Sequence, residues 1–406
     1  MNKSICILFI ILFFISPGIS FAGDEPTSAS KIARKVFEEI RRGSINGELG
    51  IYYEHIDYKE DSFVEEDEIV ELNDSDLIVP FFQIEYLTAE YSGFSIGAGL
   101  TGYTHINGDS KQEDSVGDED DVVVHKLYLG YEISRTSLKI GRMAFQESLL
   151  LSDYYEALGL VSEEIENLFL FLAVVDKVAD SDIDKFIDFQ NINRGDDSID
   201  DYLLAVETTW NAVPDAITPT LYYYHQGSLY DLYGTHVELF HESEEVGIGL
   251  NMDAYATNED SENGLRDRDD QVKDSDIYHI SPFLEVNDFT LAAGYIKADH
   301  DVGAREGGLI DDYFNPFNEG DKVYEPDGET WYGVLSYESD SFYAQLIFGK
   351  TDYLDGEESL TEKEFDINAG VKFLENFRID IEFGIIDSES LEGDYKILEM
   401  LLTYEF

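Results

Sequence analysis

The sequence predicts a closed transmembrane β-barrel of antiparallel strands, and three observations lead to this expectation. Many segments alternate apolar and polar residues with the period of a strand. Short and long connections alternate between these segments along almost the whole chain. After the first 22 residues, no segment has the roughly 18 consecutive apolar residues of a membrane-spanning helix. Because a lipid-facing sheet must close on itself to satisfy its backbone hydrogen bonds, strands that cross a membrane form a barrel.

The period-2 alternation is clearest near the C-terminus. In FRIDIEFGI, which begins at Phe377, apolar and polar side chains take opposite faces, and the last strand, YKILEMLLTYEF, repeats the pattern. A one-residue slip would exchange the two faces, so the register is well specified. The residues expected to face lipid are Phe377, Ile379, Ile381, Phe383, Leu402, Tyr404 and Phe406, and those expected to face the lumen are Arg378, Asp380, Glu382 and Glu399.

The connections fall into two classes. The short ones lie at Ser92-Gly93, Arg135-Thr136, Val213 to Asp215, Glu242 to Glu245, Asn287-Asp288, Ser339-Asp340 and Glu375-Asn376. The long acidic ones run over Lys59 to Leu77, Asn107 to Asp121, Asp180 to Asp200, Thr257 to Asp276, His300 to Gly328 and Asp352 to Glu362. This asymmetry is typical of the periplasmic turns and extracellular loops of outer-membrane barrels.

The strand count is eighteen if Tyr154 to Val161 forms a short strand. Without that strand the count is seventeen, an odd number that would leave the termini on opposite sides of the membrane. The sequence therefore predicts eighteen strands with both termini periplasmic, and sixteen is the fallback.

Composition excludes some function classes. The chain has 406 residues, with 87 acidic and 26 basic side chains, and a formal net charge of −61. Nucleic acid needs a basic surface, and so does electrostatic docking on anionic lipid, so both are excluded. Hydrophobic residues make up 43% of the chain, which argues against disorder.

Residues 1–22 resemble a secretory signal peptide. Lys3 provides the positive start, Ile5 to Ile15 the apolar stretch, and Ser20-Phe21-Ala22 a small-x-small cleavage site. The single cysteine, Cys6, lies inside this segment, so disulfides and thiolate metal sites are not expected in the mature chain. Loss of Lys3 gives a mature charge of 25 − 87 = −62.

The remaining chain divides into two expected parts. Residues 23–43 form a short periplasmic segment, in which Ser28 to Arg42 has a helical apolar stripe. Residues 44–406 form the barrel. The chain ends on Phe406, with Tyr404 two residues before it, which is similar to the assembly signal that outer-membrane barrels present to their insertion machinery. A soluble edge strand that ends on phenylalanine is the alternative.

Three stretches resemble OprD-type and related outer-membrane porins. They are KVFEEIRRGSINGELGIYYEHID after the signal segment, LKIGRMAF, and YYEALGLVSEEIENLFLFLAVV. The first resembles the amphipathic segment and first strand of that family, and LKIGRMAF the strand that enters its pore-constricting loop. The resemblance implies an eighteen-stranded barrel and diffusive uptake of small hydrophilic solutes. The departures are Met143, where related porins often have glutamine, and unusually acidic loops.

In a porin, the functional chemistry is a charged constriction in a water-filled lumen. The alternative is that alternate polar residues merely solvate the interior. Arg142 is a pore-lining candidate, although strict alternation from Leu138 and Ile140 points it at lipid, so a bulge near Gly141 or a position near the rim is expected. The other lumen candidates from strand parity are Lys126, Glu132, Lys139, Asp366, Lys372, Arg378, Asp380, Glu382, Glu399 and Glu405.

The segment Gln146 to Asp153 is the candidate constriction loop. It carries Glu147 and Asp153 around the apolar run Leu149-Leu150-Leu151, which could pack on the inner barrel wall. A surface loop that packs on its neighbours is equally compatible with the sequence.

Metal and catalytic motifs are weak or missing in the sequence. Glu259 to Asp270 places Gly264 at the sixth position of an EF-hand, but the ligand positions fit poorly. A looser expectation is that the acidic loops bind divalent cations or bridge to lipopolysaccharide. An enzyme would need a serine brought to a base such as His236, and no recognised motif supplies that spacing. The histidines are scattered over positions 55, 105, 125, 225, 236, 241, 279 and 300.

These observations favour a weakly selective outer-membrane porin for small hydrophilic solutes or ions, without enzymatic activity or cofactor. The acidic excess favours cations or zwitterions. Two alternatives remain open: a polymer-export barrel of the alginate-export type, which would need a lumen rich in Arg and Lys, and a closed surface-binding or adhesion barrel, which would not conduct.

Overall fold

The computed structural model describes residues 41–59, 62–65, 68–71, 74–104, 106, 122–179, 190–191, 202–214, 216–227, 230–243, 246–259, 274–300, 313–320, 322–356, 358–390 and 393–406. The chain divides into two units, residues 1–42 and 43–406. The expected signal peptide and residues 23–40 lie outside the described residues.

The second unit consists almost entirely of strands. The one helical turn among the described residues is the 3₁₀ helix η1 (Lys322–Tyr324), and no helix there is long and apolar enough to cross a membrane. The strands are β1 (Ser44–Tyr58), β2 (Ser62–Glu65), β3 (Glu68–Glu71), β4 (Ser75–Leu87), β5 (Phe94–Tyr103), β6 (Val122–Ile133), β7 (Thr136–Ala144), β8 (Tyr154–Ser162), β9 (Leu168–Ala179), β10 (Gln190–Asn191), β11 (Leu203–Trp210), β12 (Ile217–Gln226), β13 (Tyr230–Glu242), β14 (Val246–Glu259), β15 (Ser275–Val286), β16 (Phe289–Ala298), β17 (Glu329–Glu338), β18 (Phe342–Asp355), β19 (Glu358–Phe373), β20 (Phe377–Ser388) and β21 (Tyr395–Glu405).

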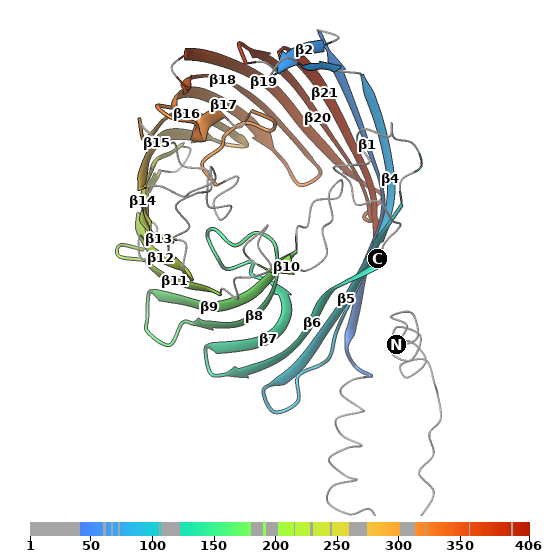
Figure 1. Cartoon of the computed structure of the whole chain (residues 1–406). Coiled ribbons are helices and arrows are strands. Elements are labelled where there is room, and N and C mark those ends of the chain that lie inside the picture. The colour runs from blue at the N-terminus through green and yellow to red at the C-terminus, as the bar shows by residue number, and fades with distance from the viewer. Residues whose placement is uncertain are drawn as a thin grey trace, which may run out of the picture. The chain divides into compact units, whose positions relative to one another are not determined.

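Eighteen of these strands form a closed antiparallel barrel (Figure 1). Each pairs with its neighbour in sequence, and β1 pairs with both β4 and β21, so no edge is left open. The two-residue strand β10 is an addition beside β9, and β2 and β3 form a separate hairpin. The expected eighteen-stranded barrel is confirmed, and the uncertain segment Tyr154 to Val161 is strand β8.

Short turns alternate with longer connections around most of the ring, as the sequence predicts, although only residues 227–229 join β12 to β13 on the side of the longer connections. One expected long loop, Asp352 to Glu362, is wrong. There β18 and β19 continue to a hairpin in which Asp355 pairs with Glu358 around Gly356, whose φ is +62°. Glycine adopts this left-handed conformation without the steric cost of a side chain. The acidic residues of this segment therefore lie along two long strands, not in a loop.

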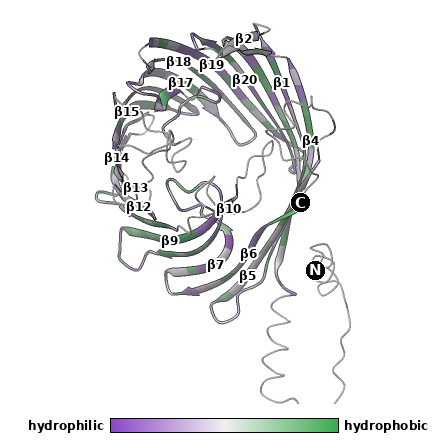
Figure 2. Cartoon of the chain, in the orientation of Figure 1, coloured by the Kyte–Doolittle hydropathy of each residue, from purple (hydrophilic) through white to green (hydrophobic). Residues whose placement is uncertain are grey.

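The two faces of each strand differ in exposure. On β20 and β21, Ile381 and Leu402 are 39% and 40% exposed, while Asp380, next to Ile381 in the alternation, is 7% exposed. Exposed apolar side chains belong on the lipid side of a membrane barrel. Figure 2 shows hydrophilic and hydrophobic residues alternating along the strands.

Aromatic pairs gather near both ends of the strands. Phe94–Tyr131, Phe289–Tyr337 and Phe377–Tyr404 lie at the short-turn end, with ring centroids 4.6 to 4.8 Å apart. Tyr58–Tyr395 and Tyr295–Trp331 lie at the other end. Two such belts are typical of the two membrane–water interfaces of outer-membrane barrels.

The last residue takes part in closing the ring. The N–H of Phe406 donates to the carbonyl of Gly47, and the N–H of Gly47 donates to the carbonyl of Phe406, both at 2.9 Å. The Phe406 ring covers Gly47 so closely that a side chain there would clash with it. The Tyr404 ring stacks on Phe406 with 6.2 Å between centroids. Both aromatic residues therefore belong to the β1–β21 seam.

Candidate functional site

The inner face of the barrel carries buried charged residues on many strands. Glu207 on β11, Asp253 on β14 and Asp366 on β19 are 2%, 6% and 0% exposed, and their strand neighbours on the opposite face are turned outward. Buried carboxylates are stable only with hydrogen-bonding partners. Here some partners come from neighbouring strands, and others come from two loops that turn inward, between β7 and β8 and between β16 and β17 (Figure 1).

The first inward segment, residues 145–153, is held by Glu207. The N–H of Leu149 donates to both carboxylate oxygens of Glu207, at 3.0 and 2.9 Å, and the hydroxyls of Ser148 and Tyr224 also donate to it. Because Glu207 lies three strands from β7, these bonds fix the segment across the inner wall. Charge-assisted hydrogen bonds of this kind are the stronger ones in proteins.

Apolar packing completes this attachment. Leu150 and Leu151 are buried in the cluster that includes Phe171 and Leu203, and Phe145 packs edge-on against Phe171 at 5.2 Å. Met143, the residue that departs from the resembling family, is 1% exposed in the same cluster. The two expected constriction residues Gln146 and Glu147 are exposed, and the N–H of Asp153 donates to the hydroxyl of Tyr155.

The second inward segment, residues 313–320, is attached first to β14. The hydroxyl of Tyr313 donates to Asp253 at 3.0 Å. Nδ1 of His236 on β13 and Nδ1 of His279 on β15 also lie 2.6 and 3.0 Å from the Asp253 carboxylate, and Nε2 of His279 lies 2.7 Å from the hydroxyl of Tyr332. Asp253 thus joins three neighbouring strands to the start of the segment.

The far end of this segment is attached to β19. The N–H groups of Glu319 and Gly320 donate to the Glu364 carboxylate at 3.0 and 2.7 Å. The N–H of Asn318 donates to Asp366 at 3.4 Å. The segment therefore crosses the inner face from β14 to β19. Glu364 accepts hydrogen bonds from backbone N–H groups of this segment, just as Glu207 does from the first segment.

Carboxylates surround this second attachment. The amide of Asn318 donates to Glu382 on β20 at 3.2 Å, and the hydroxyl of Tyr52 on β1 lies within hydrogen-bond distance of both Glu54 and Glu399, to one of which it donates. Burial, followed by the charges of Glu399, Glu54, Asp366 and Glu382, raises the pKa of Glu319 to about 8. Burial is the largest cause of this shift, and the negative groups near the loop add to it, because like charges disfavour ionisation.

The inner basic residues on β6 and β7 are paired with acids. Lys126 lies 2.5 Å from Glu85, and Lys139 lies 3.9 Å from Glu147 of the first inward segment. The buried His125 also contacts Glu85 at 3.3 Å. Both lysines have a carboxylate partner, so this side of the interior carries paired charge.

Arg142 requires a correction, because it does not line the lumen. It pairs directly with Leu127, which is 50% exposed on the outer face, and opposite residues of an antiparallel pair share a face. The expected bulge near Gly141 is also missing from the β6–β7 and β7–β8 registers, although Gly141 has φ +128°. Arg142 lies two residues from the end of β7, where it bonds to Glu156 at 2.7 Å. The structure agrees with the other expectation, that Arg142 lies near the rim of the barrel.

The remaining candidates lie toward the short-turn end. Arg378 pairs with Asp380 at 2.8 Å, and Lys372 lies 3.6 Å from Glu405. Glu132 is exposed near the end of β6. These residues share the inward parity of Asp366 and Tyr128 on their strands, but they are farther along the strands from the two inward segments.

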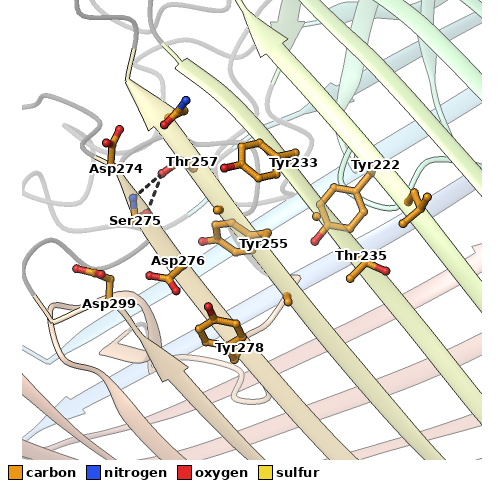
Figure 3. Close-up of a pocket in the computed structure, with 15 residues that line it drawn as sticks. Tyr222, Tyr233, Thr235, Tyr255, Thr257, Asp274, Ser275, Asp276, Tyr278 and Asp299 are labelled. Atoms are coloured by element: carbon orange, nitrogen blue, oxygen red, sulfur yellow. Dashed lines mark hydrogen bonds between the residues drawn. The ribbon is translucent and has the colours of Figure 1, made fainter.

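A groove of about 780 Å³ lies elsewhere, over β13, β14 and β15 (Figure 3). Its sides carry Leu221, Tyr233 and Tyr278, which are 58%, 48% and 55% exposed. These are outward residues of their strands, so the groove belongs to the outer wall and not to the lumen.

No metal or catalytic centre is evident in the described part of the chain. No three His, Cys, Asp or Glu residues there are grouped so that they could hold a metal ion. Most of the Glu259 to Asp270 segment and His105 lie outside the described residues. His236 is bonded to Asp253, and among the described residues no serine is hydrogen-bonded to it.

The fold and the inner face define a class: a transmembrane-type β-barrel whose charged interior is crossed by two inward loops. Solved outer-membrane porins of the OprD/Occ group share this fold. OccK9 (OpdG) of Pseudomonas aeruginosa superposes with a TM-score of 0.74 at 14% identity, covering 91% of this chain and 99% of that one. OccK3 (OpdO) of the same organism superposes with a TM-score of 0.72 at 17% identity, covering 92% of this chain and 98% of that one. OccAB4 of Acinetobacter baumannii superposes with a TM-score of 0.71 at 12% identity, covering 89% of this chain and 98% of that one.

No protein-family model matches the sequence, and no significant relative is found among curated proteins. At identities of 12% to 17%, the likeness to these porins establishes the fold, and it confirms the fold expected from the resemblance.

Sequence reasoning missed the second inward segment. Its residues Asn318, Glu319 and Gly320 lie inside a connection that the sequence indicates only as a long acidic link. A signal was present, because YFNPFNEG interrupts the acidic run with aromatic residues, Asn, Pro and Gly. Aromatic residues that a solvated loop does not need indicate packing against a wall.

Proposed function

We propose that the chain is a passive outer-membrane channel for small hydrophilic solutes and ions, with a preference for cations. The observation that carries the proposal is the contrast between an outer face of exposed apolar residues and a charged inner face narrowed by two anchored loops. A porin needs both features, the first for lipid and the second for selectivity. The proposal includes membership of the OprD/Occ group, an outer-membrane location and the absence of enzymatic activity.

The preference for cations is supported by the unequal pairing of inner charges. Lys126, Lys139 and Arg378 each have a carboxylate partner. Asp366 and Glu382 make no ion pair among the described residues, so the interior keeps a negative excess. Glu319 adds to this excess only above its pKa, which burial raises to about 8. One structural neighbour, OpdK, was solved with vanillate, a carboxylate. Here an anion would have to displace the carboxylates that already hold the lysines.

The remaining parts of the proposal concern assembly and partners. Residues 1–22 direct export and residues 23–43 lie in the periplasm. The barrel-insertion machinery recognises Tyr404 and Phe406 at the barrel seam. The acidic extracellular loops contact lipopolysaccharide through divalent cations.

The test is the conductance of purified protein in planar bilayers, together with swelling of proteoliposomes in small sugars. Ohmic single-channel steps and swelling support a pore, whereas a stably inserted but non-conducting barrel refutes it and favours the closed binding barrel. Uptake of an acidic polymer alone would favour the export barrel.

Lumen access can be mapped by cysteine substitution, because Cys6 lies in the expected signal peptide. A water-soluble thiol reagent should label positions 380 and 382 and spare 379 and 381. The reverse pattern would refute the assignment of faces.

A further inference from the structure

The groove on the outer wall of β13 to β15 has a floor of small side chains between larger ones (Figure 3). Tyr233 pairs directly with Ala256, and Ala254 pairs directly with Tyr278. Because opposite residues of an antiparallel pair share a face, each alanine lies beside a tyrosine on the outer wall. We define the outer groove as the floor residues Thr235, Ala254 and Ala256 and the wall residues Leu221, Tyr233 and Tyr278.

The dimensions of the outer groove suit a hydrocarbon chain. Tyr233 lies on β13 and Tyr278 on β15, and two strand spacings amount to about 9–10 Å. Both tyrosines are exposed, so they project from the sheet on either side of the alanine methyl groups. A space of this width admits an extended alkyl chain. A protein partner would need a far larger face, since a stable interface buries about 800 Å² on each side.

The outer groove lies at the end of the barrel that carries the longer connections. Tyr278 is near the start of β15 and pairs with Lys297 of β16. Tyr295, two residues earlier on β16, belongs to the aromatic belt at this end. In the proposed topology this end faces the cell exterior, so the groove opens to the outer leaflet at the level of its head groups. In an outer membrane that leaflet is lipopolysaccharide, whose lipid A carries both acyl chains and phosphates.

Carboxylates border the groove at its outer end. Asp276 pairs with Ala256 of the floor, and the N–H of Asp299 donates to the carbonyl of Asp276 at 2.9 Å. The hydroxyl of Tyr278 is hydrogen-bonded to the Asp276 side chain, which joins this wall of the groove to its rim. Mg²⁺ is usually bound through one or two carboxylates together with phosphates of its ligand, and it keeps several waters. Two neighbouring aspartates are therefore enough to bridge a lipid phosphate through this ion.

The lysine beside the groove does not offer its charge freely to a phosphate. Nζ of Lys297 donates to the carbonyl of Asp327 at 3.1 Å and is ion-paired with the carboxylate of the same residue. A phosphate that approaches this end of the wall meets aspartates, and a lysine that an aspartate already holds. The contact therefore needs a divalent cation between the two sets of negative charges.

We propose that the outer groove is a binding site for the lipid A part of lipopolysaccharide. One acyl chain lies on the alanine floor between Tyr233 and Tyr278, and Mg²⁺ bridges a lipid phosphate to Asp276 and Asp299. This inference rests on the proposed outer-membrane location and deepens the proposed contact with lipopolysaccharide, because it assigns that contact to one place and adds a site for an acyl chain.

The test is binding of purified lipid A to the barrel in detergent with magnesium chloride, measured by native mass spectrometry as the fraction of barrels that carry the lipid. We expect saturable binding to the wild type. Removal of Mg²⁺ with a chelator should weaken it about fivefold or more, because the phosphate then faces the aspartates without a bridging charge. Lipid A from which the phosphates have been removed should bind equally with and without Mg²⁺.

The decisive variant is the double substitution Ala254→Phe with Ala256→Phe, which fills the floor with side chains that a lipid-facing wall tolerates. An acyl chain enters the groove from other hydrocarbon, so its gain is close packing and not removal from water. We therefore expect a moderate loss of lipid A affinity, about fivefold. The matched control is Ala293→Phe, at an exposed alanine of β16 outside the groove, which should leave binding unchanged.

A second variant separates the rim from the floor. Asp276→Asn with Asp299→Asn removes the two carboxylates and keeps the alanine floor. Its binding of lipid A should no longer depend on Mg²⁺. Heat-modifiable migration of each variant on a gel verifies that the barrel has assembled.

Several outcomes overturn the inference while the pore remains. These are unchanged affinity in the filled-floor variant, an equal loss in the Ala293→Phe control, and wild-type binding that does not depend on Mg²⁺. A wild-type dimer that the filled-floor variant converts to a monomer would also overturn it, because a second copy would then occupy the groove. Lipid binding is read without ion flow, so a barrel that binds lipid A but does not conduct would instead overturn the proposed pore.

Discussion

The two inward segments use the same attachment in opposite surroundings. Glu207 receives the N–H of Leu149 inside an apolar cluster, and Glu364 receives the N–H groups of Glu319 and Gly320 inside a group of acids. In the first case the carboxylate lies among apolar side chains, and its hydrogen bonds hold the segment in place. In the second case the anchoring residue Glu364 lies among other acidic side chains, which repel one another. We infer that the first segment fixes the width of the passage and the second sets its electrostatics.

The largest expected effect is that of Glu207→Ala. It leaves the N–H of Leu149 and the hydroxyls of Ser148 and Tyr224 without their acceptor in a buried site. We expect a loss of about 2–4 kcal/mol in stability, since each unsatisfied buried donor costs about 1–3 kcal/mol. The freed segment should raise single-channel conductance by roughly twofold, if its attachment to the inner wall limits the passage.

Glu207→Gln is the control for this prediction, because its amide oxygen still accepts the N–H of Leu149. Its conductance should stay near that of the wild type. If Glu207→Ala also conducts like the wild type, the segment does not limit the passage.

The second prediction contrasts Glu364→Gln with Glu207→Gln. Glutamine at 364 keeps one acceptor for the N–H groups of Glu319 and Gly320 and removes one of the two carboxyl groups that repel each other in the Glu364–Asp366 pair. The lost charge-assisted bonds and the relieved repulsion offset each other, so stability should change by less than about 1 kcal/mol. At position 207 there is no repulsion to relieve, and we expect a loss of about 1–2 kcal/mol. Heat or denaturant unfolding in detergent compares them, and equal losses would remove the distinction between the two anchors.

The third prediction is a pH dependence that belongs to the second segment. Because the pKa of Glu319 is raised to about 8, the group is neutral below that pH and gains its charge as the pH rises through it. The ratio of cation to anion permeability should therefore increase between about pH 6.5 and 9.5, by roughly a factor of two. The Glu319→Gln variant should show a clearly smaller rise. A wild-type ratio that falls over this range would contradict the assignment.

The smallest effect is expected for Arg142→Gln. Arg142 lies on the outer face and shares Glu156 with Lys177, so part of the ion pairing survives its loss. Stability should change by less than about 1 kcal/mol, as for other exposed ion pairs, and conductance should not change. A clear change in ion selectivity would mean that Arg142 lines the lumen after all.

The fold could be predicted from the sequence because lipid imposes a strict rule on every strand. Ile381 and Leu402 must be apolar where Asp380 need not be, and this alternation is visible without a structure. The hairpin at Gly356 was missed because charged residues can form strands above the membrane as readily as loops. The strand-to-strand neighbours follow from the order of the strands, but the contents of the barrel do not.

The candidate site was harder to predict, since its contacts join distant parts of the chain. Asn318 is hydrogen-bonded to Glu382, 64 positions away in the sequence, and Leu149 to Glu207, 58 positions away. Local patterning carries no information about such partners. Strand parity could place Asp366 and Glu382 on the inner face, but it could not show that a loop would cover one and leave the other accessible.

The central claim, a pore whose unpaired carboxylates set its selectivity, is tested most directly by a reversal potential across a potassium chloride gradient. The acidic loops and the inner carboxylates Asp366 and Glu382 attract cations over about 8–10 Å at physiological salt and farther in dilute electrolyte. We predict a reversal potential on the cation-selective side at low ionic strength, declining as salt is raised. Anion selectivity in dilute electrolyte would contradict the account. It would mean that Lys126, Lys139 and Arg378 govern the passage despite their acidic partners, and that carboxylate solutes fit this pore better than amines.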